Sequence, residues 1–300
     1  LEAAYQPDVL PAMVVEQILC TVVADMEQLV YPITPAPEPA VNPCLPSLTD
    51  LLKQQFSTYR NHPFLLWSKG QLTYGQTDAL ANRLCQRLRE TGLTSGSRVG
   101  ILLSKSPLQA IASLAATKAG AAFLPLDLEY PPEMLSAIAH RAELSLIVTE
   151  PALAERAASC GVPCLTVEEA WLNAVPSQVA AFQGYRWQPE EVLVIINTSG
   201  TTGEPKGVML HHFNYREAIR IHDIRLTAMT DKDVSMNFLP LTHVFEKAWT
   251  YFCLHRGVQV CVNLRPADIQ TTIKEIRPTL MCSVPRFWEK VYAGVQEKIN

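Results

Sequence analysis

Residues 197–207 combine four hydroxyl side chains, three glycines and one lysine within eleven positions. Glycines at this density let several backbone N–H groups point toward one centre, and the hydroxyls add further hydrogen-bond donors. Lys206 adds a positive charge at the rim of the same segment. These residue types at this spacing predict a loop that holds phosphate groups.

The residues around this loop narrow its type. Residues 192–196 form an unbroken apolar run, which is typical of a strand buried on both faces. The Walker loop of P-loop NTPases requires Gly-Lys followed by Ser or Thr, whereas Pro205 precedes Lys206 and Gly207 follows it. The sequence therefore disfavours a P-loop NTPase. A flexible surface loop rich in Ser, Thr and Gly is the alternative interpretation.

A second candidate segment spans residues 239–246. Pro240 ends a predicted strand, Thr242 is suited to a helix N-cap, and His243 falls in the first turn of that helix. A histidine at this place can contact an acyl carboxylate or a phosphate. The alternative is a first-turn histidine whose ring is satisfied by the backbone.

Basic residues elsewhere are weaker candidates. Residues 283–286 repeat the order of strand, proline and helix, so Arg286 can contact an anion or form a surface salt bridge. The predicted helix at 212–225 carries Arg216 and Arg220 four positions apart, and acidic neighbours dilute their charge. A solvated helix face is favoured there over an anion-binding patch.

The elements that must position these groups alternate along the chain from residue 47. Short apolar runs predict strands at 98–103, 121–126, 144–148, 163–167, 192–196, 233–239, 258–262 and 279–282, after a hairpin at 64–74. Helical spacing predicts helices at 48–59, 77–90, 107–119, 132–141, 212–225, 243–255, 266–275 and 286–298. This alternation predicts an α/β fold of stacked, mostly parallel sheets flanked by helices. Ligands of such sheets bind beyond the carboxyl ends of strands, where the candidate segments lie.

Composition sets broad limits on function. A chain of 300 residues with 48% hydrophobic content can bury a large core, divided over two units. The net charge of −4 predicts no nucleic-acid partner and no general attraction to anionic membranes. No apolar run is long enough to predict a transmembrane segment, which leaves room only for peripheral membrane contact. Eight cysteines without a zinc-binding pattern predict reduced thiols and a cytoplasmic location.

The N-terminal part has a different character. Residues 11–29 have the spacing of an amphipathic helix, and six prolines within 32–46 predict a semi-rigid linker. The chain starts without methionine and ends within a helical pattern, so we expect a piece of a longer protein. The predicted organisation is a helical tail of a preceding domain or an N-terminal extension at 1–31, the linker at 32–46, and two α/β subdomains at 47–184 and 185–300.

The loop also carries a family resemblance. Residues 198–208 closely resemble the signature phosphate loop of adenylate-forming, AMP-binding enzymes, which include acyl-CoA synthetases, amino-acid adenylation domains and luciferases. Residues 198–300 resemble long-chain fatty acyl-CoA synthetases, through 239–245 and 284–292. Residues 1–150 instead resemble the condensation-domain tail and adenylation domain of nonribosomal peptide synthetases, through segments such as Lys118-Ala119-Gly120-Ala121 and Pro125-Leu126-Asp127. The chain is then an outlying family member or a chimera joined between residues 150 and 197.

The resemblance implies a truncated adenylate-forming N-terminal domain and a reaction in two steps. A carboxylic acid and ATP give an acyl-adenylate and pyrophosphate, and a thiol then accepts the acyl group. The thiol belongs to CoA or to a phosphopantetheine carrier protein. By the same resemblance His243 is a catalytic residue near the carboxylate, and Thr198 is a ligand of Mg²⁺. The residues implied to hold the phosphates of ATP are Thr198, Ser199, Gly200, Thr201, Thr202, Gly203 and Lys206.

The class of the substrate acid is predicted from an aspartate that the second candidate segment lacks. Related amino-acid adenylation domains carry an aspartate there that pairs with the substrate ammonium, and residues 241–244 contain none. An ammonium buried without a counter-charge is strongly disfavoured, so we predict a long-chain fatty acid and a fatty acid–CoA ligase. An amino-acid adenylation domain of a peptide synthetase and a non-catalytic binding module are the alternatives. Because the family's later catalytic elements would follow Asn300, we expect these residues alone to bind ATP weakly without turnover.

Overall fold

The computed structural model describes residues 46–176, 185, 187–198, 206–240, 242 and 244–299. Residues Pro46–Cys282 form one compact unit, and Ser283–Asn300 belong to another. The helix predicted at 11–29 and nearly all of the linker predicted at 32–46 lie outside the described residues. In the second unit the described part contains the helix α10 (Pro285–Ile299).

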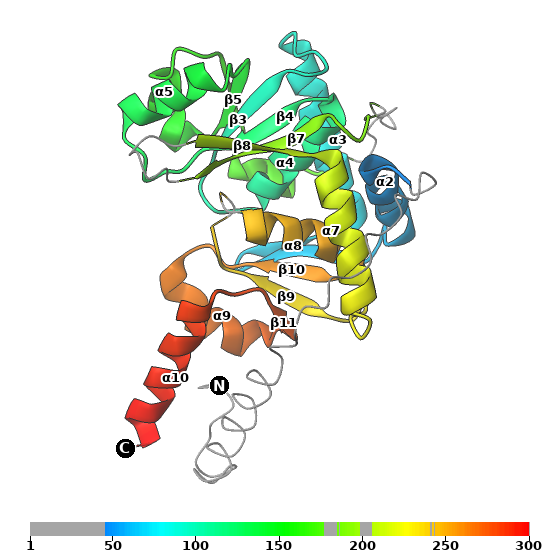
Figure 1. The fold of residues 1–300 in the computed structure, drawn as a ribbon, viewed down its shortest axis with the longest axis vertical. Coiled ribbons are helices and arrows are strands. Elements are labelled where there is room, and N and C mark those ends of the chain that lie inside the picture. The colour runs from blue at the N-terminus through cyan, green and yellow to red at the C-terminus, as the bar shows by residue number, and fades with distance from the viewer. Residues whose placement is uncertain are drawn as a thin grey trace, which may run out of the picture. The chain divides into compact units, whose positions relative to one another are not determined.

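Two sheets form the frame of the first unit (Figure 1). The six-stranded sheet has the order β6 (Cys164–Thr166), β5 (Leu146–Thr149), β3 (Arg98–Leu102), β4 (Ala122–Pro125), β7 (Val192–Thr198) and β8 (Lys206–His211). The five-stranded sheet has the order β11 (Leu280–Met281), β9 (Val234–Asn237), β10 (Gln259–Val262), β1 (Pro63–Trp67) and β2 (Gly70–Thr73). Each sheet takes strands from both sides of the predicted boundary at 184/185.

The sheets are mostly parallel, as predicted. Only the β1–β2 and β7–β8 pairs are antiparallel among the strand pairs of the described residues. The strand β8 was not predicted, although its apolar residues 208–210 follow the phosphate loop directly. It lies at the edge of the sheet and is largely exposed, so its sequence lacks the long apolar run that marks β7.

Eight α-helices of the first unit connect these strands in the described residues. They are α2 (Leu48–Thr58), α3 (Tyr74–Glu90), α4 (Pro107–Ala119), α5 (Pro132–Arg141), α6 (Ala154–Ala158), α7 (His212–Arg225), α8 (Val244–His255) and α9 (Ile269–Ile276). Short 3₁₀ turns occur at η1 (Pro151–Leu153), η2 (Glu169–Asn173) and η3 (Pro266–Asp268). None of the helices in the described part of the chain is long and apolar enough to cross a membrane.

The helix predicted from residue 77 begins three residues earlier because of a capping box. The hydroxyl of Thr73 accepts the N–H of Gln76 at 3.1 Å, and the Gln76 side chain accepts the N–H of Thr73 at 2.8 Å. This reciprocal pair satisfies two N–H groups that the first turn leaves open, so α3 starts at Tyr74.

A layer of helices lies between the two sheets, with α4 and α8 at its centre (Figure 1). The helix α4 contacts β3 and β4 of one sheet and β1 of the other. Its sequence is apolar on nearly all sides, as expected for a helix covered by neighbours all round. A second, smaller core lies under α5, where Leu135 and Ile138 pack near Ile147 of the six-stranded sheet.

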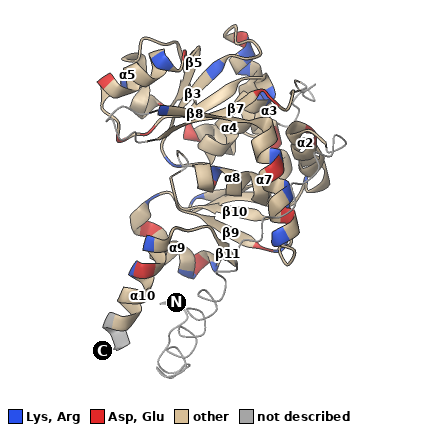
Figure 2. Ribbon diagram, in the orientation of Figure 1, with Lys and Arg blue, Asp and Glu red and all other residues tan. Residues whose placement is uncertain are grey.

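Charged residues lie mainly on helices and loops (Figure 2). Among the described residues, three charged side chains on these helices are buried, namely Arg216, Glu246 and Lys247. Arg216 contradicts the solvated face that we predicted for its helix, because it is only 9% exposed. Its guanidinium lies 3.5 Å from the carboxylate of Glu217, which also pairs with Arg220 at 2.7 Å. These arginines are therefore partly neutralised by one acidic neighbour.

His212 opens α7 in a buried position next to the six-stranded sheet. Its ring stacks on Trp187 with the ring centres 3.8 Å apart, and neither ring nitrogen has a hydrogen-bond partner within the described structure. Burial lowers the pKa of His212 to about 3 from its ordinary value of 6.5. As the pH falls below 6.5, His212 binds a proton in the unfolded chain but stays neutral in the folded chain. The folded state therefore loses stability over this pH range.

We expect His212→Phe to reduce the acid sensitivity of the fold. Between pH 7.5 and pH 5 the proton uptake at His212 costs about 2 kcal/mol of unfolding free energy, and the variant avoids this cost. Urea unfolding of both proteins at the two pH values measures the difference. The exposed His140 provides the matched control, His140→Phe. An unchanged pH dependence in His212→Phe would contradict the assignment.

Candidate active site

The phosphate loop is carried by the hairpin of β7 and β8. In the register of this hairpin Ile195 pairs with Met209, and Thr198 pairs with Lys206 at the end next to the loop. The Thr198 hydroxyl donates to the Lys206 carbonyl at 3.4 Å, and both side chains are exposed. The hairpin thus places the first and last predicted phosphate-binding residues opposite each other. The predicted residues between them, Ser199, Gly200, Thr201, Thr202 and Gly203, lie outside the described residues, as does His243.

The loop leaves the sheet at the edge where a ligand is expected. Strand β7 runs parallel to β4, and β4 runs parallel to β3. The carboxyl ends of these three strands therefore lie along one edge, so Thr198 shares that edge with Lys105 in the loop after β3. Parallel sheets bind their ligands beyond this edge.

Gly207 is required by a close approach inside the hairpin. A Cβ atom at this position would lie 2.9 Å from Cγ2 of Ile195, which real Cβ atoms essentially never tolerate. Ile195 is buried in the smaller core and has little freedom to move. The glycine thus lets β8 lie against β7 directly below the phosphate loop.

The second candidate segment begins at Leu239, which is held by two charged side chains, the half-buried Lys105 and the buried Glu246. The Lys105 ammonium donates to the Leu239 carbonyl at 2.7 Å, and the Leu239 N–H donates to Oε2 of Glu246 at 3.2 Å. Burial lowers the pKa of Lys105 and raises the pKa of Glu246, while the attraction between them opposes both shifts. These contacts join the carboxyl end of β9 to the loop after β3, and so join the two sheets.

A cavity of about 200 Å³ lies beside the hairpin, between β7, β8 and α5. Arg98, Arg141, Asn197 and Gly207 are among its lining residues. The Arg98 guanidinium donates to the Ala142 carbonyl at 2.9 Å, and Nδ2 of Asn197 is buried without a partner among the described residues. Arg98 also pairs with the Glu143 carboxylate at 3.2 Å, so its charge is partly neutralised, while the amide of Asn197 is an open donor next to the phosphate loop.

Sequence reasoning missed Lys105, Arg98 and Arg141. No motif marks them, because they are separated from residues 197–207 and 239–246 by more than fifty positions or by several elements. Arg286, which was predicted, lies in the first turn of α10 and belongs to the second unit. Its role as an anion contact stays a prediction.

Comparison with known proteins gives one family. A family model described as AMP-binding enzyme matches residues 52–299. The chain is 32% identical over 240 residues to the nonribosomal peptide synthetase ungA' of Aspergillus campestris, which covers 77% of this chain and 2% of that protein. It is also 32% identical over 248 residues to gramicidin S synthase 2 of Aneurinibacillus migulanus, which covers 79% of this chain and 5% of that protein. The chain thus spans a small part of the length of these relatives.

A solved structure agrees on the fold. The structure of ATP-bound MatB from Rhodopseudomonas palustris has a TM-score of 0.70 and 24% sequence identity, over 82% of this chain and 51% of that chain. The match confirms the α/β fold predicted from the sequence, and the family model confirms the resemblance of the phosphate loop.

We expect Gly207→Ala to force β8 away from β7 and to destabilise the hairpin by about 1–3 kcal/mol, the usual cost of overpacking. Urea unfolding gives the stability, and amide exchange of β8 reports the strand pairing. Ile195→Ala in the same chain removes the clashing methyl, so the double variant should recover the β8 protection lost in Gly207→Ala. Equal β8 protection in Gly207→Ala and the native chain would contradict the packing argument.

Proposed function

Because the chain belongs to the AMP-binding enzyme family, we propose that it serves the ATP-dependent activation of a carboxylic acid as an acyl-adenylate. The observation that carries the proposal is the β7–β8 hairpin. It sets Thr198 and Lys206 opposite each other at the carboxyl end of a buried parallel strand, on either side of the hydroxyl- and glycine-rich loop. That arrangement suits the triphosphate of a nucleotide.

The chemistry assigns separate tasks to these residues. A carboxylate oxygen forms a bond to the α-phosphorus of ATP, the bond from that phosphorus to the bridging oxygen breaks, and pyrophosphate leaves. Lys206 is exposed at the loop's end and would neutralise charge on the departing phosphates. The contact that the Thr198 hydroxyl makes within the described residues is a long one of 3.4 Å, which leaves its oxygen suited to a Mg²⁺ ligand. Residues 199–203 would add the remaining donors, and His243 would contact the carboxylate.

For the acid we propose an uncharged acyl chain of the long-chain fatty acid class. The support is the composition of residues 241–244, which offer no carboxylate to an α-ammonium group. The carboxylate that the structure places nearby, Glu246, is buried and accepts the N–H of Leu239. An amino acid would therefore bind here without a counter-charge from these residues, at a considerable desolvation cost.

An amino acid is the competing proposal. Its support is that the curated relatives named above are peptide synthetases, at 32% identity over more than three quarters of this chain. On that reading the acceptor is the phosphopantetheine thiol of a carrier protein. A non-catalytic binding module of the same fold is the third candidate, and it predicts nucleotide binding without pyrophosphate release.

The acceptor that we propose for an acyl-adenylate is CoA. The thiol sulfur bonds to the acyl carbon, the bond from that carbon to the phosphate oxygen breaks, and AMP leaves. CoA carries several phosphate groups, and Arg98 and Arg141 are among the residues that line the cavity beside the hairpin, where a phosphate would compete with Glu143 for Arg98. A carrier protein presents a single phosphodiester and has less need of such a cavity.

The proposed function predicts that Lys206→Ala and Thr198→Ala each lower acid-dependent ATP–pyrophosphate exchange by about tenfold or more, because a charge-assisted contact to phosphate is lost. The assay is run on the intact protein with palmitate and, separately, with the proteinogenic amino acids. The exposed Lys232 supplies the matched control Lys232→Ala. Unchanged exchange in both loop variants would contradict the phosphate assignment.

The same assay separates the candidate acids. Exchange stimulated by palmitate supports the fatty acid, and exchange stimulated by an amino acid overturns it in favour of the peptide-synthetase alternative. Nucleotide binding without exchange for any acid supports the non-catalytic module.

The acceptor proposal predicts that the double variant Arg98→Ala/Arg141→Ala raises the KM for CoA by about tenfold while the KM values for ATP and acid stay within twofold. Steady-state thioester formation measures all three. Arg277→Ala, on α9's C-terminal side, is the control. An unchanged KM for CoA would contradict the proposal that this cavity binds the acceptor.

A further inference from the structure

Both backbone polar groups of Leu239, in the first unit, are held by charged side chains from different elements, the buried Glu246 and the half-buried Lys105. The carbonyl of Leu239 accepts the Lys105 ammonium at 2.7 Å, and its N–H donates to the Glu246 carboxylate at 3.2 Å. Lys105 follows β3 of the six-stranded sheet, whereas Leu239 follows β9 of the five-stranded sheet. Glu246 lies in the first turn of α8. We call this arrangement the Leu239 clamp.

The clamp is costly to build. Glu246 is completely buried, and its second oxygen, Oε1, has no hydrogen-bond partner among the described residues. Taking two charges out of water is rarely recovered by their attraction, and apolar replacements of such a pair are often neutral or stabilising. Stability alone therefore does not explain why a lysine and a glutamate occupy these positions.

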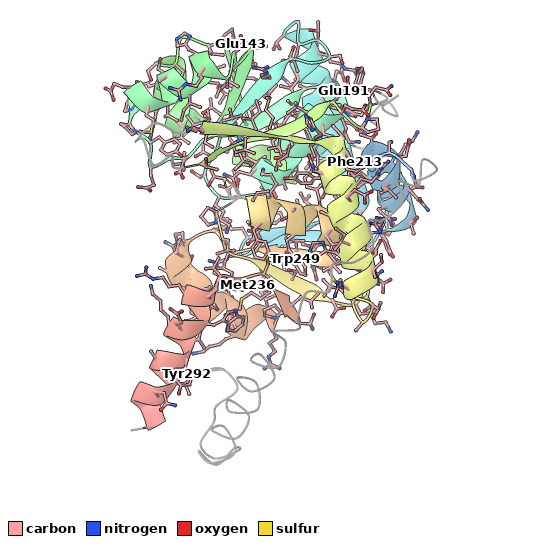
Figure 3. All side chains as sticks on the ribbon, in the orientation of Figure 1. Glu143, Glu191, Phe213, Met236, Trp249 and Tyr292 are labelled. Atoms are coloured by element: carbon pink, nitrogen blue, oxygen red, sulfur yellow. The ribbon has the colours of Figure 1, made fainter. Side chains whose placement is uncertain are left out.

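The clamp is also not needed to attach α8 to its surroundings. Trp249, labelled with Met236 in Figure 3, donates its indole N–H to the Ser235 hydroxyl of β9 at 2.8 Å. On the other side, the Lys247 ammonium donates to the Ser113 hydroxyl of α4 at 3.2 Å. These contacts fix α8 against both neighbours. What the clamp adds is the position of Leu239, where the chain leaves β9 for residues 240–243.

We propose that Lys105 and Glu246 are positioning residues, which hold the start of the β9–α8 loop against the edge of the six-stranded sheet that carries the phosphate loop. The inference rests on the proposed function, in which the β9–α8 loop receives the acid and the hairpin receives ATP. By joining the two carboxyl edges, the clamp sets the distance between the acid and the α-phosphorus. Small errors in such a distance lower the rate strongly, because the reacting atoms must approach in line.

The other titratable groups beside the clamp in the described residues carry no charge near neutral pH. The other titratable groups that interact with Glu246 and Lys105 in the described residues are the thiols of Cys253 on α8, Cys261 on β10 and Cys282 after β11. Burial raises the pKa of each thiol, so all three stay uncharged near neutral pH. Burial raises the pKa of Glu246 and lowers the pKa of Lys105, and the loss of either charge would remove the charge assistance from one hydrogen bond of the clamp.

The test compares variants that break the clamp with one that keeps it. Lys105→Met removes the donor, Glu246→Leu removes the acceptor, and the double variant replaces the pair by apolar groups. Glu246→Gln keeps an acceptor for the Leu239 N–H. Lys247→Met is the matched control, because Lys247 is a neighbouring buried lysine that does not touch Leu239.

For the intact protein we expect the double variant to raise the KM for the acid by about tenfold, with the KM for ATP within twofold and a melting temperature not below that of the native protein. Glu246→Gln should recover most of the affinity for the acid, and Lys247→Met should leave the acid KM within twofold. A merely structural pair would lower the melting temperature and impair ATP and acid together. That result, or an unchanged acid KM, would overturn the proposal.

Amide hydrogen exchange provides a readout that needs no substrate. The Leu239 N–H should exchange about tenfold faster in Glu246→Leu than in the native protein and near the native rate in Glu246→Gln, since only the first loses the acceptor. If no acid supports ATP–pyrophosphate exchange but the Leu239 amide behaves in this way, the proposed function fails while the clamp stands as a structural contact without a positioning role. Equal exchange in all variants would contradict the clamp itself.

Discussion

The structure of the first unit depends on one shared layer of helices between two sheets. The helix α4 is apolar nearly all round because it contacts β3 and β4 on one side and β1 on the other. A helix in this position cannot move without uncovering two sheets, and the burial of apolar area from both sides supplies much of the stability. The carboxyl ends of β7, β3 and β9, from which the candidate site is built, are set by this layer.

The same layer carries polar groups that a purely stable core would leave out. Lys247 is buried, and burial lowers its pKa to about 7, while its ammonium meets only the Ser113 hydroxyl and the face of Phe123 among the contacts of the described residues. Glu246 is buried nearby, and Lys105 is half-buried. Each group costs desolvation energy, so the stability of the fold alone does not account for their presence.

The β7–β8 hairpin gives the two ends of the phosphate loop a fixed base. Strand β7 is buried between β4 and β8, and Gly207 allows β8 to approach Ile195 closely. A loop rich in glycine and hydroxyl groups then starts and ends at the fixed pair Thr198 and Lys206. Positioning phosphate groups requires such a base, because the chemistry of adenylation is mostly placement and charge stabilisation.

The sequence by itself determined the elements and the chemistry of the loop. Periodicity placed most helices and strands within a few residues of their observed bounds, since amphipathic spacing is a local property, and residues 197–207 carried a phosphate-binding motif. Three features required the tertiary structure: the edge strand β8, the cavity arginines Arg98 and Arg141, and the Leu239 clamp. An edge strand is defined by its pairing with β7, and Lys105 meets Leu239 across 134 positions of the chain. The adjacent charges of Glu246 and Lys247 resemble a solvated helix face, and only the packing of α8 between two sheets buries them.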